Sequence, residues 1–192
     1  MKTSFASLAV LTAALRAAPA YLTRAADTYK IDSVHSSVGF SAMHLGVTNF
    51  YGRFDELAGD VVFDKENPAK SSVNITVQTE SLDTHNPKRD QHLKSPDFFN
   101  SKQFPTITFK SNKVEASGDT YKVSGDFTLH GVTKPITVEF KKLGEGKGMQ
   151  GEARAGGETK FAIKRSDYGM TFMPNGVGDE ITILLSLEGV KQ

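Results

Sequence analysis

Apolar and polar residues alternate one by one along most of this 192-residue chain. From residue 73 to 78 the order is Val, Asn, Ile, Thr, Val, Gln, and similar runs follow turn sequences such as ASGD at 116–119. Successive side chains of a β-strand point to opposite faces, so each run has one face for a core and one for water. About eight such runs predict an all-β, mostly antiparallel sandwich or barrel. Residues 53–57 and 59–64 are among the predicted strands, with a bulge at Gly59.

The longest break in the alternation is the segment 89–109, RDQHLKSPDFFNSKQFPTITF. Asn86 and Pro87 are typical of a helix start, which predicts a short helical segment in the long loop at about residues 86–100. Long irregular segments in compact domains are usually functional or disordered, and this one is too aromatic for disorder. We expect it to form a cap or a wall over an apolar cavity.

The first 25 residues have the features of a secretory signal peptide. Lys2 precedes the apolar run FASLAVLTAAL at residues 5–15, and small residues offer cleavage sites at 18–20 or, preferably, at 23–25. The run is shorter than the roughly 20 apolar residues that a membrane-spanning helix needs. The alternative is a buried or interfacial N-terminal helix. The sequence therefore predicts a signal peptide at 1–25, a single β-domain at 26–192 and export, to a bacterial periplasm.

Composition and motifs argue for binding rather than catalysis. The net charge of +1 gives no electrostatic case for a nucleic-acid partner, and without cysteine there is no disulfide and no thiolate metal site. The chain has no G-x-S-x-G nucleophile motif. We therefore expect no catalytic residue, no metal and no cofactor other than a bound ligand. The alternative is a metal-binding or enzymatic site around residues 89–97, where His85, Asp90, His92 and Asp97 crowd together in the sequence.

Phenylalanine is abundant, with 13 residues spread along the chain. A single Phe is usually a core residue, but together with other apolar residues these side chains are predicted to line a ligand cavity. The predicted lining residues are Phe40, Phe54, Phe63, Ile75, Val77, Leu93, Phe98, Phe99, Phe104, Ile107, Phe109, Phe127, Leu129, Val138, Phe140, Phe161, Ile163, Tyr168, Met170 and Ile183.

Several short motifs together resemble the YceI-like family. They are YKID at 29–32, HLG at 44–46 with GRF at 52–54, RDQHL at 89–93 with DFF at 97–99, FP at 104–105, GDFTLHGVTKP at 125–135 and RSDYG at 165–169. The resemblance covers residues 27–190. The combination of R-D-x-H-L with G-V-T-K-P is specific, whereas either motif alone is weak.

The resemblance implies an eight-stranded, lipocalin-like antiparallel barrel. It also implies that the barrel binds a long amphiphile, such as a polyisoprenoid, an isoprenoid quinone or a fatty acyl compound, and carries or stores it in the periplasm. The polar motif residues are then candidates for the head-group rim of the pocket: His44, Arg53, Arg89, Asp90, His92, Arg165 and Asp167. Transient contact with a membrane or a membrane redox protein, and a homodimer, are further expectations. A stress-related scaffold without a ligand stays open as an alternative.

Overall fold

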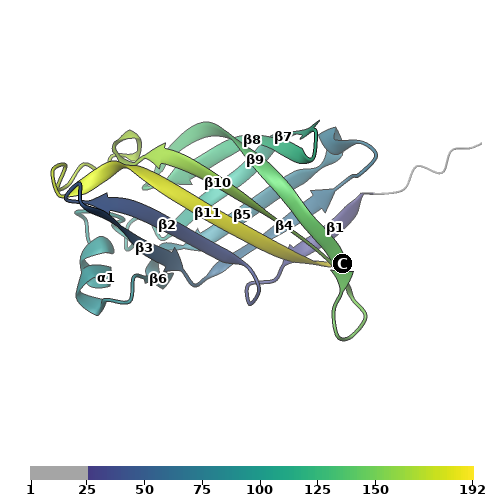
Figure 1. The fold of residues 1–192 in the computed structure, drawn as a ribbon, viewed down its shortest axis with the longest axis horizontal. Helices are drawn as coiled ribbons and strands as arrows, with labels where there is room; N and C mark the ends of the chain where they lie inside the picture. The colour runs from purple at the N-terminus through teal and green to yellow at the C-terminus, as the bar shows by residue number, and fades with distance from the viewer. Residues whose placement is uncertain (1–25) are drawn as a thin grey trace, which may run out of the picture.

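Eleven strands form one continuous antiparallel sheet in this computed structural model, which describes residues 26–192 (Figure 1). The predicted signal peptide at residues 1–25 lies outside the described part of the chain. The strands are β1 Asp27–Ile31, β2 Ser37–His44, β3 Thr48–Phe54, β4 Leu57–Phe63, β5 Ser72–Gln78, β6 Leu82–Asp83, β7 Thr106–Ser117, β8 Thr120–Leu129, β9 Val132–Lys147, β10 Ala153–Lys164 and β11 Val177–Lys191.

Eight of these strands close into a barrel in the order β1-β4-β5-β7-β8-β9-β10-β11, because β11 pairs with β1 as well as with β10. At the closing seam Tyr29 pairs with Lys191 and Ile31 with Gly189. Within this ring each of the eight strands has a partner on both sides, so the ring has no free edge at which chains could aggregate. The predicted eight-stranded antiparallel barrel is confirmed.

Strands β2, β3 and β6 lengthen the barrel wall at one end. The long strand β11 pairs with β1 near its carboxyl end and with β2 further back, where Ile183 lies opposite Phe40. Strand β2 then pairs with β3, and β3 with the short β6. Short 3₁₀-helices lie in the connections between strands: η1 Pro68–Lys70, η2 Thr79–Ser81 and η3 Arg165–Tyr168.

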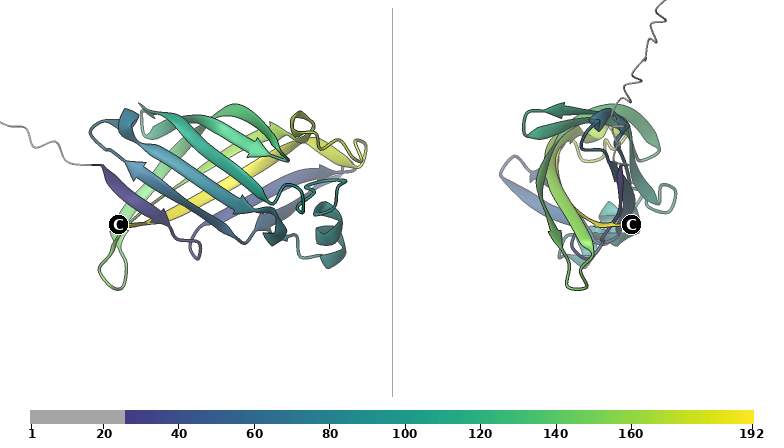
Figure 2. Two further views of the ribbon diagram at one scale, coloured as in Figure 1. Left: turned by 180° about the vertical axis from the view of Figure 1, so that it is seen from behind. Right: turned by 90° about the vertical axis from the view of Figure 1, so that its right-hand side faces the viewer.

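Helix α1, Pro87–Leu93, lies at this same end and falls within the predicted helical segment. Pro87 occupies the first turn, and the Asn86 side chain accepts a hydrogen bond from the Arg89 backbone N–H, as expected of an N-cap. When the barrel is viewed from its other end, α1 lies behind the ring of strands (Figure 2). The two ends of the barrel are therefore unlike, because in residues 26–192 only one of them carries an α-helix. Among the described residues, no helix is long and apolar enough to cross a bilayer.

The predicted strand at residues 53–57 and the predicted bulge at Gly59 are wrong. Strand β3 ends at Phe54 and β4 begins at Leu57, with a bend in the chain between them. Gly59 pairs regularly with Ile75, and a Cβ atom at this position would lie 2.1 Å from the Asn74 carbonyl oxygen. Glycine is needed here for close approach of two backbones, which is the other common reason for glycine within a strand.

Candidate ligand-binding site

A cavity of about 230 Å³ extends along the inside of the barrel. Its wall runs from Phe98, Phe99 and Met170 beneath α1 to Phe63 and Tyr121 at the opposite end. This volume is just below the roughly 300–1,000 Å³ of common ligand pockets. A cavity so long and so small in volume is narrow, and its shape suits one extended chain better than a bulky ring system.

The alternation of the strands builds this wall. In β9, Ile136, Val138 and Phe140 point inward between the exposed residues Thr137 and Glu139. Strands β7 and β8 bring Phe109 opposite Phe127 in the sheet, and both rings line the cavity. Phe127 also packs edge-on against Phe161, with the ring centroids 6.2 Å apart.

All of the predicted lining residues belong to the cavity wall except Phe104 and Tyr168. Phe104 packs against His130, with ring centroids 4.5 Å apart. Tyr168 is 2% exposed and packs edge-on against Phe127, with ring centroids 5.7 Å apart. Phe104 lies in the loop before β7, and Tyr168 lies in the short helix η3. Both residues are outside the strands, where the alternation of faces does not apply.

An aromatic cluster closes the cavity at the helix end. Phe99 packs edge-on against Phe54 and Phe40, with centroid distances of 5.5 and 6.3 Å. Leu93, the last residue of α1, and Phe98 are both buried next to them. The segment 89–109 therefore forms a cap, as its sequence predicts, and the cap fills this end of the barrel with hydrocarbon.

Arg165 is the one predicted rim residue that lines the cavity. It is only 4% exposed, and burial lowers the pKa of its guanidinium. Its Nη1 donates to the Met170 carbonyl at 2.7 Å, Nη2 to the Val177 carbonyl at 2.9 Å and Nε to the Gly178 carbonyl at 3.1 Å. Because main-chain oxygens take these donors, Arg165 ties the loop before β11 to the barrel.

Three other predicted rim residues lie outside the cavity wall. Arg53 forms ion pairs with Asp55 at 2.9 Å and Asp83 at 3.2 Å on the outer face of β3. Asp167 pairs with Lys134 at 3.3 Å. His44 is exposed at the end of β2.

The remaining predicted rim residues hold the cap in place. The Arg89 Nε donates to the Thr84 hydroxyl at 2.7 Å, and Asp90 accepts from both the backbone N–H (2.9 Å) and the hydroxyl (2.5 Å) of Thr84. Thr84 directly follows β6, so these bonds fasten α1 to the sheet. His92 binds Asp97 at 2.9 Å across the turn after α1, and its ring packs against Phe98.

The described residues do not gather His85, Asp90, His92 and Asp97 into one metal-like cluster. Within residues 26–192, the side chains with such spacing are Asp32, His35 and Glu188. The Arg154 guanidinium donates to Asp32 at 2.7 Å and to Glu188 at 2.5 Å, so a cation already compensates these carboxylates.

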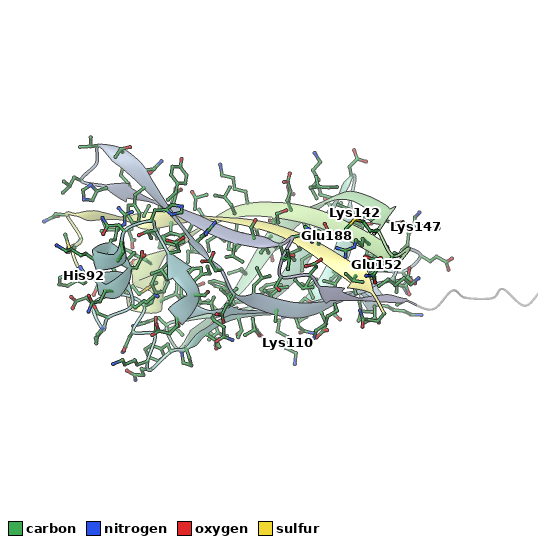
Figure 3. All side chains as sticks on the ribbon, turned by 90° about the horizontal axis from the view of Figure 1, so that it is seen from below. His92, Lys110, Lys142, Lys147, Glu152 and Glu188 are labelled. Carbon is green, nitrogen blue, oxygen red and sulfur yellow. The ribbon has the colours of Figure 1, made fainter. Side chains whose placement is uncertain are left out.

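The opposite end of the barrel carries a polar group that the sequence reasoning missed. Lys142 lines the cavity, with its Nζ 4.7 Å from the centre of the Phe63 ring and paired with the Glu145 carboxylate. Tyr121 packs edge-on against Phe63 at 5.4 Å. Figure 3 places Lys142 at the end of the molecule opposite His92. The parity of Ile136, Val138 and Phe140, extended by one step, is the sequence signal that identifies Lys142 as inward-facing.

A model of the YceI-like domain matches residues 29–189, which is most of the chain. The chain belongs to the YceI-like family. It is 42% identical over 170 residues to Protein YceI of Escherichia coli O17:K52:H18, covering 88% of each chain, and 41% identical over 194 residues to a UPF0312 protein of Pseudomonas paraeruginosa, covering all of both.

Solved structures of other proteins share the barrel. The YceI protein of Campylobacter jejuni superposes with a TM-score of 0.70 at 29% identity, over 78% of this YceI-like chain and 90% of the other. BcnA of Burkholderia cenocepacia reaches 0.75 at 24% identity, over 82% and 98% of the two chains. A polyisoprenoid-binding domain from Saccharophagus degradans reaches 0.67 at 16% identity, over 85% and 98%. The last two share the fold at low identity.

Proposed function

We propose that this YceI-like protein binds one long-chain amphiphile inside its barrel and carries or stores it in the periplasm. The ligand is a polyisoprenoid, an isoprenoid quinone or a fatty acyl compound. The observation that carries this proposal is the narrow apolar cavity that extends from Phe99 beneath α1 to Phe63 at the opposite end. The Saccharophagus degradans domain, which shares the fold, is described as polyisoprenoid-binding, and this supports a polyisoprenoid among these classes.

The physical driving force is the burial of hydrocarbon. Each buried CH₂ group contributes about 0.8 kcal/mol, so a chain of many methylenes binds tightly through apolar contacts alone. An eight-stranded barrel is wide enough to hold one small ligand among its inward side chains. Binding and carriage require no bond to be made or broken, and the role we assign to this site is not catalytic.

The proposed location rests on residues 1–25, which have the charged start, apolar run and small-residue sites of a signal peptide. A carrier in the aqueous periplasm would exchange its ligand during transient contact with a membrane. Expression of the full chain in a bacterium, followed by fractionation and N-terminal sequencing, tests this. Recovery of the uncleaved chain in the cytoplasm would refute the periplasmic role.

Native mass spectrometry tests ligand binding directly. Protein purified without detergent is expected to show a second mass, heavier by one lipid, that disappears after organic extraction. Extraction and mass analysis would then identify the lipid. Protein that carries no lipid, and that also fails to take up geranylgeraniol or palmitate after delipidation, would contradict the proposal.

A further inference from the structure

The cavity wall carries two formally charged side chains in the described residues, and they lie at opposite ends. Arg165 is beneath the cap, where main-chain carbonyl oxygens accept hydrogen bonds from its guanidinium. Lys142 is at the other end, where its side chain keeps 25% of its surface exposed. An ammonium has three N–H donors, and Glu145 takes one of them. Lys142 is thus placed to touch both water and a ligand that occupies the cavity.

The surroundings of Lys142 favour an anion. The wall of the cavity contains no Asp or Glu side chain among the described residues. The carboxylate of Glu145 pairs with the Lys142 ammonium. The hydrogen bond from Lys142 is the main reason that the pKa of the Glu145 carboxyl is lowered. A phosphate monoester carries about −1.5 to −2 charges at neutral pH and would compete well with this single carboxylate. Lysine binds phosphate as a point charge and does not need a fixed geometry, which suits the partly exposed end of the cavity at Lys142.

A second polar group lies deeper along the same wall. Thr159 is 6% exposed and lines the cavity, and its hydroxyl oxygen has no hydrogen-bond partner. A buried hydroxyl without a partner is unfavourable, so a ligand oxygen at this point would stabilise the complex. Gly157 pairs with Lys142 in the sheet, and Thr159 is two residues further toward the cap. At about 3.4 Å of rise per residue, Thr159 is about 7 Å deeper than Lys142.

We propose that the end of the barrel opposite α1 is a head-group site for an amphiphile with an anionic head, a phosphate ester in particular. Lys142 binds the phosphate at the mouth, Thr159 donates a hydrogen bond to an oxygen further along the ligand, and the hydrocarbon tail extends toward Phe99. The ligand enters tail first. This inference rests on the proposed lipid binding and adds to it the chemistry and the location of the head group. The site is at the opposite end from the motif residues around α1.

The test compares two probes of equal chain length, geranylgeranyl phosphate and geranylgeraniol, on delipidated protein. Their affinities are measured by displacement of the fluorescent probe N-phenyl-1-naphthylamine, which is convenient because the chain has no Trp. Native protein is expected to bind the phosphate about tenfold more tightly than the alcohol, the difference that one charge-assisted hydrogen bond supplies. Lys142→Gln should abolish this preference while leaving the affinity for the alcohol within about twofold of the native value.

The matched control is Lys141→Gln, which removes a charge from the neighbouring outward-facing lysine and should leave the tenfold preference intact. Thr159→Val keeps the size of the side chain and should weaken both probes about fivefold, because both have an oxygen at the start of the tail. Thr182→Val, on the outer face of β11, is its control. Far-UV circular dichroism and the unfolding midpoint verify that each variant is folded.

Two results overturn the inference, and they are distinguishable. If both probes bind and Lys142→Gln leaves the preference for phosphate unchanged, the head-group site is wrong while lipid binding stands. If neither probe displaces the fluorophore from native protein, lipid binding itself fails and the head-group site with it. Unchanged affinities in Thr159→Val would remove Thr159 from the site.

Discussion

Replacing Arg165 by methionine should destabilise the protein without changing its preference for an anionic ligand. Methionine matches the length of the arginine stem but cannot donate hydrogen bonds. The substitution leaves the carbonyls of Met170, Val177 and Gly178 without the donors that lie 2.7 to 3.1 Å away in the native protein. Each lost hydrogen bond costs about 1 kcal/mol, so the loss should be about 3 kcal/mol in the free energy of unfolding.

Chemical denaturation followed by far-UV circular dichroism measures this change. For a domain of roughly 150–250 residues, a loss of 3 kcal/mol lowers the unfolding midpoint by about 6–12 °C, so thermal unfolding is an independent check. Arg165→Lys keeps the charge but cannot reach three separate carbonyls, and we expect it to recover about a third of the loss. A loss below about 1 kcal/mol in Arg165→Met, together with a tenfold weaker binding of geranylgeranyl phosphate, would show that Arg165 is a head-group residue and not a structural one.

Three further predictions follow from the same structure. Phe109→Arg should reduce the amount of bound lipid at least tenfold, because a cation in the apolar wall is costly. Lys110→Arg, on the outer face, should leave the amount of bound lipid unchanged, and native mass spectrometry measures both variants. Full lipid loading of a folded Phe109→Arg variant would exclude Phe109 from the cavity lining. Glu145→Gln should tighten binding of geranylgeranyl phosphate about threefold by freeing Lys142, and weaker binding would count against the mouth site. Hydrogen bonds from His35 and then Arg154 lower the pKa of the Asp32 carboxyl in the folded protein. Its contribution to stability is therefore present above the unfolded pKa of about 3.9 and is lost as the pH falls toward the folded value. Between pH 7 and 3, Asp32→Asn should lose less stability than the native protein, and an equal loss in the two proteins would show that Asp32 does not make this contribution.

The local pattern of the sequence was enough to predict most of the strands and which residues share a face of each strand. Ile75, Val77, Phe127 and Phe140 all line the cavity, because alternation along a strand fixes which side chains share a face. Closure of the barrel was not available from periodicity, since a sandwich has the same alternation. The resemblance of the motifs to the YceI-like family supplied the barrel, and the pairing of β1 with β11 confirms it.

The polar part of the site was harder to predict, because it depends on which strand ends meet in space. His44, Arg89 and His92 are prominent in the sequence motifs, but they lie on or outside the cap. Lys142 stands just before the Gly-rich run at 144–151, which gives no apolar signal, although β9 continues to Lys147. The register that places Lys142 opposite Gly157 shows that the alternation of β9 continues this far and turns the residue inward.

Three of the motif residues hold the cap and its neighbouring loop in place. Arg89 and Asp90 both bind Thr84, which fixes α1 to the sheet, and Arg165 fixes the loop before β11. Buried or partly buried polar groups of this kind are costly to leave without partners, which explains why they occur as linked sets. The cap therefore depends on these groups for its position, and the cavity depends on the cap for its closed end.

Nuclear Overhauser effects in isotope-labelled protein loaded with an unlabelled lipid locate the bound lipid directly. If the lipid lies inside the barrel, its chain contacts the ring protons of Phe109 and Phe127 and the methyl groups of Val138, all in the cavity wall. Contacts confined to Leu45 and Val47, whose side chains are 59% and 81% exposed, with no change at the interior residues, would exclude binding inside the barrel.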